Sequence, residues 1–209
     1  AAPDPGSRNA TQHILPVSAH SLPGDVSGAI AGHVRDGRHL ELQAVEPAAV
    51  HVIIRAILAA RNHLAQDGIA IAVALRSLQV EIRGEPKTAI CFPITAFTAA
   101  AGTESAQERQ TPAPNPIQVA AGSVPHDVAG AVARRVREGE RVEVRAVGVA
   151  ATCVAVRALL IARRYLEGDA IAIATSPDLA TTERDGEQVT AICFPITAWS
   201  AGKDAGADD

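Results

Sequence analysis

Guanidinium groups at matched positions are the feature of this sequence best suited to binding a ligand. Arg55 and Arg61 recur as Arg157 and Arg163, 102 residues further along the chain. Because a guanidinium fork matches the geometry of a phosphate group, these four arginines are candidate nucleic-acid contacts. The alternative is that they lie in solvent or between repeats, over alanine-rich surface. Residues six apart on a helix differ by about 240°, so the two arginines of each repeat are not expected to share one face.

A second basic group lies in the second half of the chain, where Arg134 and Arg135 are the leading candidates for nucleic-acid contacts. Arg137, Arg141 and Arg145 follow, but Glu138, Glu140 and Glu143 are interleaved with them. Mixed charges of this kind are typical of a salt-bridged, solvated surface, which is the competing interpretation. If nucleic acid is bound, the second half of the chain is the expected contact.

Two loops complete the candidate binding residues. His20 and Ser21, and Ser123 in the second half, precede expected helix N-termini, where backbone N–H groups can meet a phosphate. The alternative is that these Ser-x-Pro segments only cap and turn the chain.

The sequence offers little for catalysis or for a metal. Cys91, Cys153 and Cys193 have no metal-ligand spacing and no adjacent base, and two of them lie in apolar strands, which is typical of buried thiols. Six of the seven histidines fall in the first half, without the clustering of a metal site. Motifs for nucleotide binding or nucleophilic catalysis are absent from the sequence. We therefore predict a protein that is not an enzyme, with no cofactor and no metal.

Composition sets the broad class. The 209 residues are 47% hydrophobic and only 2% aromatic, so Ala, Val, Ile and Leu must build the core. The net charge of −4 gives no overall attraction to nucleic acid or to an anionic membrane, so any anion site must be local. Few cysteines and no run of about 20 apolar residues favour a cytoplasmic protein that is not inserted in a membrane.

An internal duplication organises the chain. Residues 13–97 align with residues 115–199 without a gap, and the hexapeptide CFPITA occurs in both. Residues 98–114 between the repeats are small, polar and proline-containing, which predicts a flexible linker. Residues 1–12 and the acidic tail 200–209 are expected to be disordered.

Each repeat predicts the order βαβαββ. In the first, a short strand at Leu15 and Val17 precedes a helix that begins near Asp25 and ends at Gly37. A strand over 40–44 follows, with Glu41 and Gln43 expected on a solvated face, and then a helix over 48–64. A hairpin turning at 83–86 closes the repeat, with Pro93 expected at a strand end, bulge or unpaired edge. The result is two modules of the α/β class, each a four-stranded mixed sheet packed on two helices.

Five short segments of the first repeat resemble the stage V sporulation protein S family. They are VSAHSLP over 17–23, VSGAIAG over 26–32, ELQAV over 41–45, RAILAAR over 55–61 and KTAI over 87–90. The second repeat carries VAGAVA over 128–133 and VRALLIAR over 156–163 at the same places. The resemblance implies Alba-like modules that pair with one another, nucleic-acid binding, and a role in bacterial sporulation or developmental regulation.

Two departures bear on that expectation. Members of the family carry a lysine in the loop after the first strand, where this chain has His20 and Gly122. The tandem arrangement also lets one chain supply both modules of a pair, so the predicted partners are nucleic acid, DNA or RNA, and the other repeat, with further self-association open. The alternative function is a protein-interaction or assembly module that has lost nucleic-acid binding. A small-ligand or metal-binding protein is a third class, which rests only on the histidine count.

Overall fold

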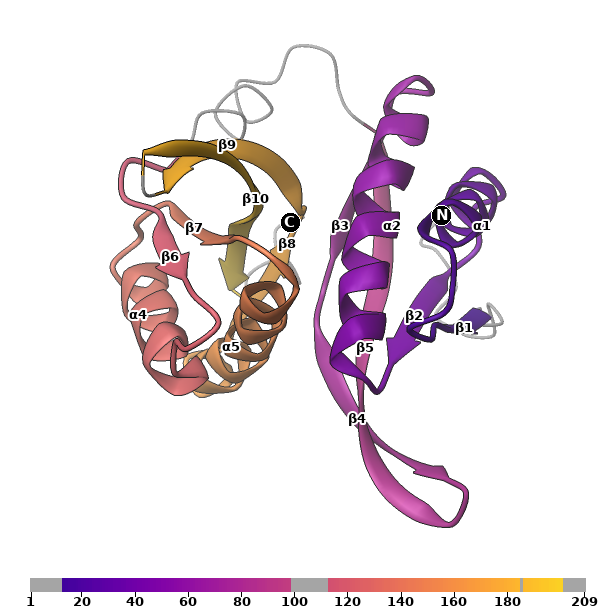
Figure 1. Ribbon diagram of the computed structural model, residues 1–209, viewed down its shortest axis with the longest axis horizontal. Helices are drawn as coiled ribbons and strands as arrows, with labels where there is room; N and C mark the ends of the chain where they lie inside the picture. The colour runs from indigo at the N-terminus through magenta and orange to yellow at the C-terminus, as the bar shows by residue number, and fades with distance from the viewer. Residues whose placement is uncertain (1–12, 99–112, 185, 201–209) are drawn as a thin grey trace, which may run out of the picture.

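The computed structural model describes residues 13–98, 113–184 and 186–200. The first repeat contains β1 (His13–Pro16), α1 (Pro23–Arg35), β2 (Leu40–Ala44), α2 (Pro47–Ala65), β3 (Ile69–Val73), β4 (Arg76–Ile82) and β5 (Glu85–Thr98). The second contains β6 (Ile117–Val119), α4 (Pro125–Arg137), β7 (Val142–Ala146), α5 (Val149–Glu167), β8 (Ile171–Thr175), β9 (Asp178–Arg184) and β10 (Glu187–Ser200). Two helices and a mixed sheet in each repeat confirm the predicted α/β class (Figure 1).

The first half of each repeat follows its sequence signals. Pro23 occupies the first turn of α1, two residues before Asp25, so the helix begins slightly earlier than predicted. Gly37 has a φ of 65°, a conformation that glycine adopts at little cost, and it follows the helix as expected. Strands β1 and β2 are parallel, as a helical crossover requires.

The third strand of each repeat is interrupted. Strands β3 and β4 both pair antiparallel with β5, but Ala74 and Leu75 between them belong to neither strand, and Ala74 keeps one hydrogen bond, from its N–H to the Pro93 oxygen at 3.3 Å. Pro93 lies inside the central strand β5, opposite this interruption. It pairs with β2 on one side and faces the break between β3 and β4 on the other, so it is not at an unpaired edge of the sheet. The break turns one predicted strand into two, and each repeat therefore contributes five strands to the sheet.

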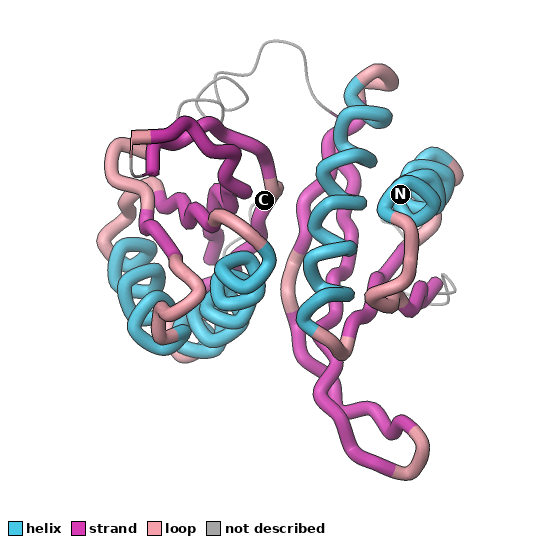
Figure 2. The backbone as a smooth tube through the Cα atoms, viewed as in Figure 1, coloured by secondary structure: helices cyan, strands magenta, loops and turns pink. Residues whose placement is uncertain are grey.

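Helices lie against the sheet in each repeat, as Figure 2 shows, and the buried hydrophobic side chains come from both the helices and the strands. Aliphatic side chains dominate the core, as composition predicted, and Phe92 and Phe194 are its largest fully buried members. In contrast, the expectation that Glu41 lies on a solvated face is wrong: Glu41 is 0% exposed and its counterpart Glu143 is 8% exposed. The Arg76 guanidinium covers Glu41 and pairs with it, which offsets the cost of burying the carboxylate.

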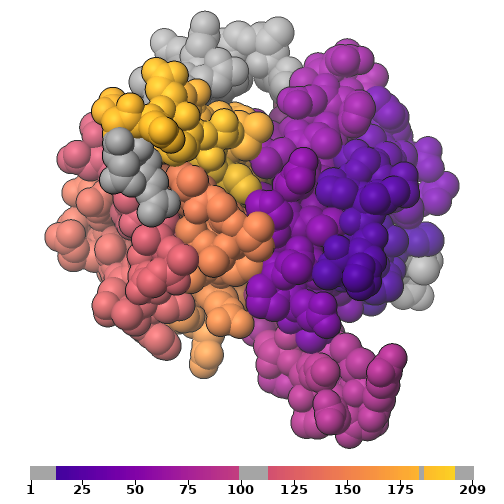
Figure 3. Space-filling view, in the orientation of Figure 1, coloured from indigo at the N-terminus to yellow at the C-terminus, as the bar shows by residue number. Residues whose placement is uncertain are grey.

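The two repeats contact each other through equivalent elements. Strands β3 and β8 pair antiparallel, with Val73 opposite Thr175, and α2 contacts α5. Val73 and Thr175 are themselves equivalent at the offset of 102, so an approximate two-fold axis passes between them. One ten-stranded sheet therefore runs through both repeats, which abut as two lobes in Figure 3.

The connecting and terminal segments are described only in part. Strand β5 ends at Thr98 and β10 at Ser200, so the first residue of the predicted linker and the first of the predicted tail are in strands. The expectations of disorder for residues 1–12 and 201–209, and of a flexible linker over 99–112, concern residues outside the described part of the chain. None of the described helices is both long and apolar enough to cross a lipid bilayer.

Candidate nucleic-acid interface

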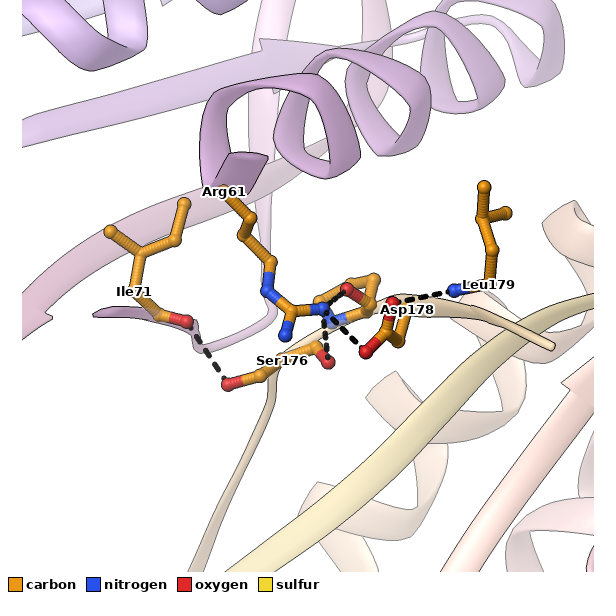
Figure 4. A network of polar contacts seen from close by, with 6 residues as sticks. Arg61, Ile71, Ser176, Asp178 and Leu179 are labelled. Carbon is orange, nitrogen blue, oxygen red and sulfur yellow. Dashed lines mark hydrogen bonds and ion pairs between the residues drawn. The ribbon is translucent and has the colours of Figure 1, made fainter. Parts of the chain in front are cut away.

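Arg61 and Arg163 bridge the two repeats at positions related by the approximate two-fold axis. Arg61 of α2 donates hydrogen bonds to the backbone oxygens of Ser176 and Pro177 and lies 3.4 Å from the Asp178 carboxylate (Figure 4). Arg163 of α5 donates to the Leu75 oxygen at 2.7 Å. Since Leu75 and Pro177 are equivalent residues, the two arginines make the same type of contact in opposite directions. The structure thus places these two predicted residues at the inter-repeat boundary.

A groove with a volume of about 590 Å³ opens where α5 meets the start of β4. Its charged and titratable lining consists of Arg76, Arg157, Arg163, Arg164, His126 and Glu167. Arg76 pairs with the buried Glu41 and Arg163 lies near Glu167, so Arg157 and Arg164 carry the positive surplus of the groove, although the chain as a whole carries −4.

The four arginines of the groove are not equally available to a ligand. Arg157 and Arg164 are exposed, and within the described part of the chain their side chains form no salt bridge or hydrogen bond. Arg163 is half-buried and lies 3.6 Å from Glu167, while Arg76 is paired with Glu41. Arg157 and Arg164 are thus the groups with free donors, and Arg76 and Arg163 add charge from fixed positions.

Arg157 and Arg163 share this groove although they lie on different sides of α5. The helix geometry separates them by about 240°, as expected. Repeat 1 closes against α5 through Leu75, and the long Arg163 side chain reaches that residue across the groove wall. The two arginines do not share one face of α5, as expected, and they line the same groove because repeat 1 supplies its other wall.

A smaller groove of about 270 Å³ occupies the symmetry-related place on the other side of the axis. Arg61, Leu58 and Leu179 line it at positions equivalent to Arg163, Leu160 and Ser77 of the larger groove. Its charged lining consists of Arg61 and Asp178, which pair with each other. The two grooves lie at equivalent places, but the larger carries a positive surplus, whereas the two charges of the smaller one cancel.

Two positions at which the repeats carry different charges account for much of this difference. Asp178 stands where the first repeat has Arg76, and Arg145 stands where it has Gln43. The buried carboxylate is therefore neutralised from β4 in repeat 1, by Arg76, and from its own strand in repeat 2, where Arg145 pairs with Glu143. Because Arg145 of β7 already pairs with Glu143, position 178 is not needed as a cation and can carry an acid.

Loop residues predicted to contact nucleic acid have local roles in the structure. The Ser21 hydroxyl accepts a hydrogen bond from the Ser18 N–H at 3.1 Å, and Ser123 does the same for Ala120 at 3.0 Å. The His20 N–H donates to the Ser18 hydroxyl at 3.2 Å. These bonds close the turn before each first helix, and none of the three residues lines either groove.

The remaining predicted arginines lie apart from the grooves. Arg134 is exposed on α4 and lies 3.7 Å from Glu138, one turn further on. Arg135 donates to the Asn115 oxygen and lies 3.9 Å from Glu140, which fixes the start of the second repeat to α4. Arg55 is exposed on α2 and lines neither groove, although its counterpart Arg157 does.

Burial keeps the thiols protonated. Burial, followed by the nearby carboxylate, raises the pKa of Cys91 and of Cys193 to about 11. Burial also raises the pKa of Cys153 and lowers the pKa of His51, whose Nδ1 is buried without a hydrogen-bond partner. At neutral pH these groups are poor nucleophiles or cations. Across the described ranges, no three His, Cys, Asp or Glu side chains come together as ligands for a metal ion.

Three basic residues of the larger groove were not predicted from the sequence: Arg76, His126 and Arg164. Each differs from its counterpart in the other repeat, which has Asp178, Gly24 and Asn62 respectively. The predicted arginines of this groove, Arg157 and Arg163, are shared by both repeats, whereas these three residues are found by comparing where the repeats differ.

Comparison with known families agrees with the geometry. The family model described as stage V sporulation protein S (SpoVS) matches the chain twice, over residues 13–97 and 115–199. The two matches cover most of the sequence and coincide with the two structural repeats. The chain therefore belongs to the stage V sporulation protein S family, as a tandem duplication of its module.

Proposed function

We propose that this chain is a non-catalytic regulatory protein of the stage V sporulation protein S type that binds nucleic acid through the groove formed by α5 and β4. The observation that carries the proposal is the lining of that groove, with four guanidinium groups and one carboxylate. Guanidinium groups bind phosphates through paired, charge-assisted hydrogen bonds. The raised thiol pKa values support a role without nucleophilic catalysis.

The two repeats act together in this proposal. Neither repeat supplies the groove alone, because Arg76 comes from repeat 1 and Arg157, Arg163 and Arg164 come from repeat 2. We propose that the chain forms an intramolecular pair of modules, supported by the β3–β8 pairing and the bonds of Arg61 and Arg163. Its setting would be the bacterial cytoplasm, in regulation of sporulation or development.

A salt titration of nucleic-acid binding tests the proposal. Binding of duplex DNA and of RNA is measured by fluorescence anisotropy, starting at about 50 mM salt and micromolar protein, where weak phosphate contacts still hold. With two to four phosphates neutralised, the slope of log K against log salt should lie between about −2 and −4. No binding of either nucleic acid under these conditions would exclude the proposed function.

Arg157→Gln and Arg55→Gln form a matched pair for the same assay. Both arginines are exposed at equivalent positions of equivalent helices, and both changes remove one positive charge. Arg157→Gln should weaken binding to all sequences and reduce the salt slope by about 1, since it removes one phosphate contact. Arg55→Gln should leave both quantities nearly unchanged, because Arg55 does not line the groove. Equal effects of the two changes would point to unspecific charge attraction.

A protein-interaction role is the second candidate, favoured by the hairpin of β4 and β5. This hairpin projects from the body of repeat 1 (Figure 1), and Leu78 and Ile82 of β4 are 44% and 36% exposed. Within the described residues, β4 pairs only with β5, so its outer edge is open to another strand. Changing both side chains to Thr should abolish a partner complex under this alternative and leave nucleic-acid affinity unchanged under the first.

A further inference from the structure

We infer that the exchange of Arg76 for Asp178 restricts nucleic-acid binding to one of two symmetry-related grooves, so that each chain carries a single phosphate-binding site. A pair of identical modules would present two equal grooves across its two-fold axis. This chain retains the symmetric architecture but has Arg76 in one groove and Asp178 at the equivalent place in the other, beside a further difference of Arg164 against Asn62. The inference rests on the proposed function and concerns how many sites the chain has and which residue decides this.

Asp178 pairs with Arg61, which is the only cationic side chain among the described residues that line the smaller groove. Arg61 directs its guanidinium toward the backbone oxygens of Ser176 and Pro177 and toward the Asp178 carboxylate, as Figure 4 shows. A phosphate entering here would meet a carboxylate and would compete with internal acceptors for the same donors. Like charges brought together disfavour binding, so the smaller groove should reject a phosphodiester backbone.

Arg76 has the opposite effect in the larger groove. It stands at the position equivalent to Asp178 and adds a cation beside Arg163, whose guanidinium donates to one backbone oxygen of repeat 1. Arg157 and Arg164 add donors that no described side chain occupies. Of the described residues that line this groove, Glu167 is the one carboxylate, and it lies 3.6 Å from Arg163. The larger groove can therefore hold a phosphate with free donors and a surplus of positive charge.

The chain itself indicates how to reverse the exchange without leaving a buried charge unpaired. In repeat 1, Gln43 accompanies Arg76, and Arg76 pairs with the buried Glu41. In repeat 2, Arg145 pairs with the buried Glu143, and Asp178 is 62% exposed. The double change Arg145→Gln/Asp178→Arg rewrites repeat 2 with the residues of repeat 1, so the new arginine can pair with Glu143 as Arg76 pairs with Glu41. The new arginine would line the smaller groove together with Arg61, just as Arg76 and Arg163 together line the larger groove.

The reciprocal double change Gln43→Arg/Arg76→Asp rewrites repeat 1 with the residues of repeat 2. It keeps Glu41 next to a cation on its own strand, as Glu143 has in Arg145. It also places an acid beside Arg163 in the larger groove. This variant should lose the binding site by the same mechanism that neutralises the smaller groove.

The experiment measures stoichiometry by isothermal titration of the full chain with an oligonucleotide too short to span both grooves. We expect one site on the wild-type chain and a second, weaker site on Arg145→Gln/Asp178→Arg, because the smaller groove has Asn62 in place of Arg164 and is not lined by Arg55. Gln43→Arg/Arg76→Asp should lose at least tenfold in affinity. Circular dichroism and urea unfolding establish that each variant is folded. Asp178→Asn serves as a further control, since removing the acid without adding the arginine should give no second site.

The outcomes separate the inference from the proposed function. One site on the wild type and still one on Arg145→Gln/Asp178→Arg would overturn the inference and leave nucleic-acid binding in place. Two equal sites on the wild type would overturn the inference as well. No binding by the wild type would overturn the proposed function, and with it the inference.

Discussion

Replacing Arg145 by Met should destabilise the second repeat, because the Glu143 carboxylate would remain buried without its cation. Their side chains are 13% and 11% exposed, and the Arg145 guanidinium is hydrogen bonded to Glu143. Removing one partner of a buried ion pair costs about 3–5 kcal/mol. Since both side chains keep slight contact with solvent, we expect a loss of about 3 kcal/mol in the free energy of unfolding. For a protein of this size, that loss lowers Tm by about 6–12 °C.

Urea unfolding followed by circular dichroism measures this loss, with the double variant Glu143→Gln/Arg145→Met as the partner experiment. The second change removes the buried charge, so the double variant should recover more than half of the stability lost by Arg145→Met. Arg134→Met is the matched control for loss of an arginine from repeat 2. Arg134 is in an exposed pair with Glu138, so its removal should cost less than about 1 kcal/mol.

Two results would refute this account of the buried pair. Arg145→Met could prove as stable as Arg134→Met, which would mean that Glu143 finds solvent or another cation. Alternatively, the double variant could be less stable than Arg145→Met alone, which would mean that the carboxylate charge itself stabilises the repeat.

The thiols and the interface arginines give two further predictions. Because the pKa of Cys91 and Cys193 is raised from 9.0 to about 11, their stabilising contribution is complete below pH 9 and is lost between about pH 9 and pH 11, as the unfolded chain deprotonates first. Unfolding free energies across this range should fall in wild type and fall less in Cys91→Ala/Cys193→Ala, and an equal fall would contradict the assignment. Arg61→Met should cost about 1–2 kcal/mol, and Arg163→Met about 1 kcal/mol, because Arg61 makes more contacts across the interface. The reverse order in urea unfolding would contradict this assignment.

The fold was predictable from local patterns, with specific exceptions. Periodicity located both helices of each repeat, and the glycine after α1 marked its end. The interruption at Ala74 and Leu75 was not predicted, because β3 and β4 form one continuous extended pattern in the sequence. The burial of Glu41 was also missed, since alternation along a strand cannot reveal a cation that arrives from a strand 35 residues away.

The candidate site was predictable only in part. Arg157 and Arg163 were identified because the repeats share them, but their role depends on the wall that repeat 1 adds to the groove. Helix geometry placed Arg157 and Arg163 on different faces of α5, which is correct. It could not show that they line one groove, because the second wall of that groove comes from the other repeat. Aligning the repeats for their differences would have found Arg76 opposite Asp178, although only the structure shows that both positions face the inter-repeat grooves.

The most direct test of the central claim is an NMR titration of the arginine Nε–H resonances with a short oligonucleotide. The account predicts that Arg157 and Arg164 shift most, that Arg76 and Arg163 shift with the same dissociation constant, and that Arg55 and Arg61 remain unchanged. Equal shifts at Arg61 and Arg163, or shifts confined to α4, would contradict the assignment of the larger groove as the nucleic-acid site.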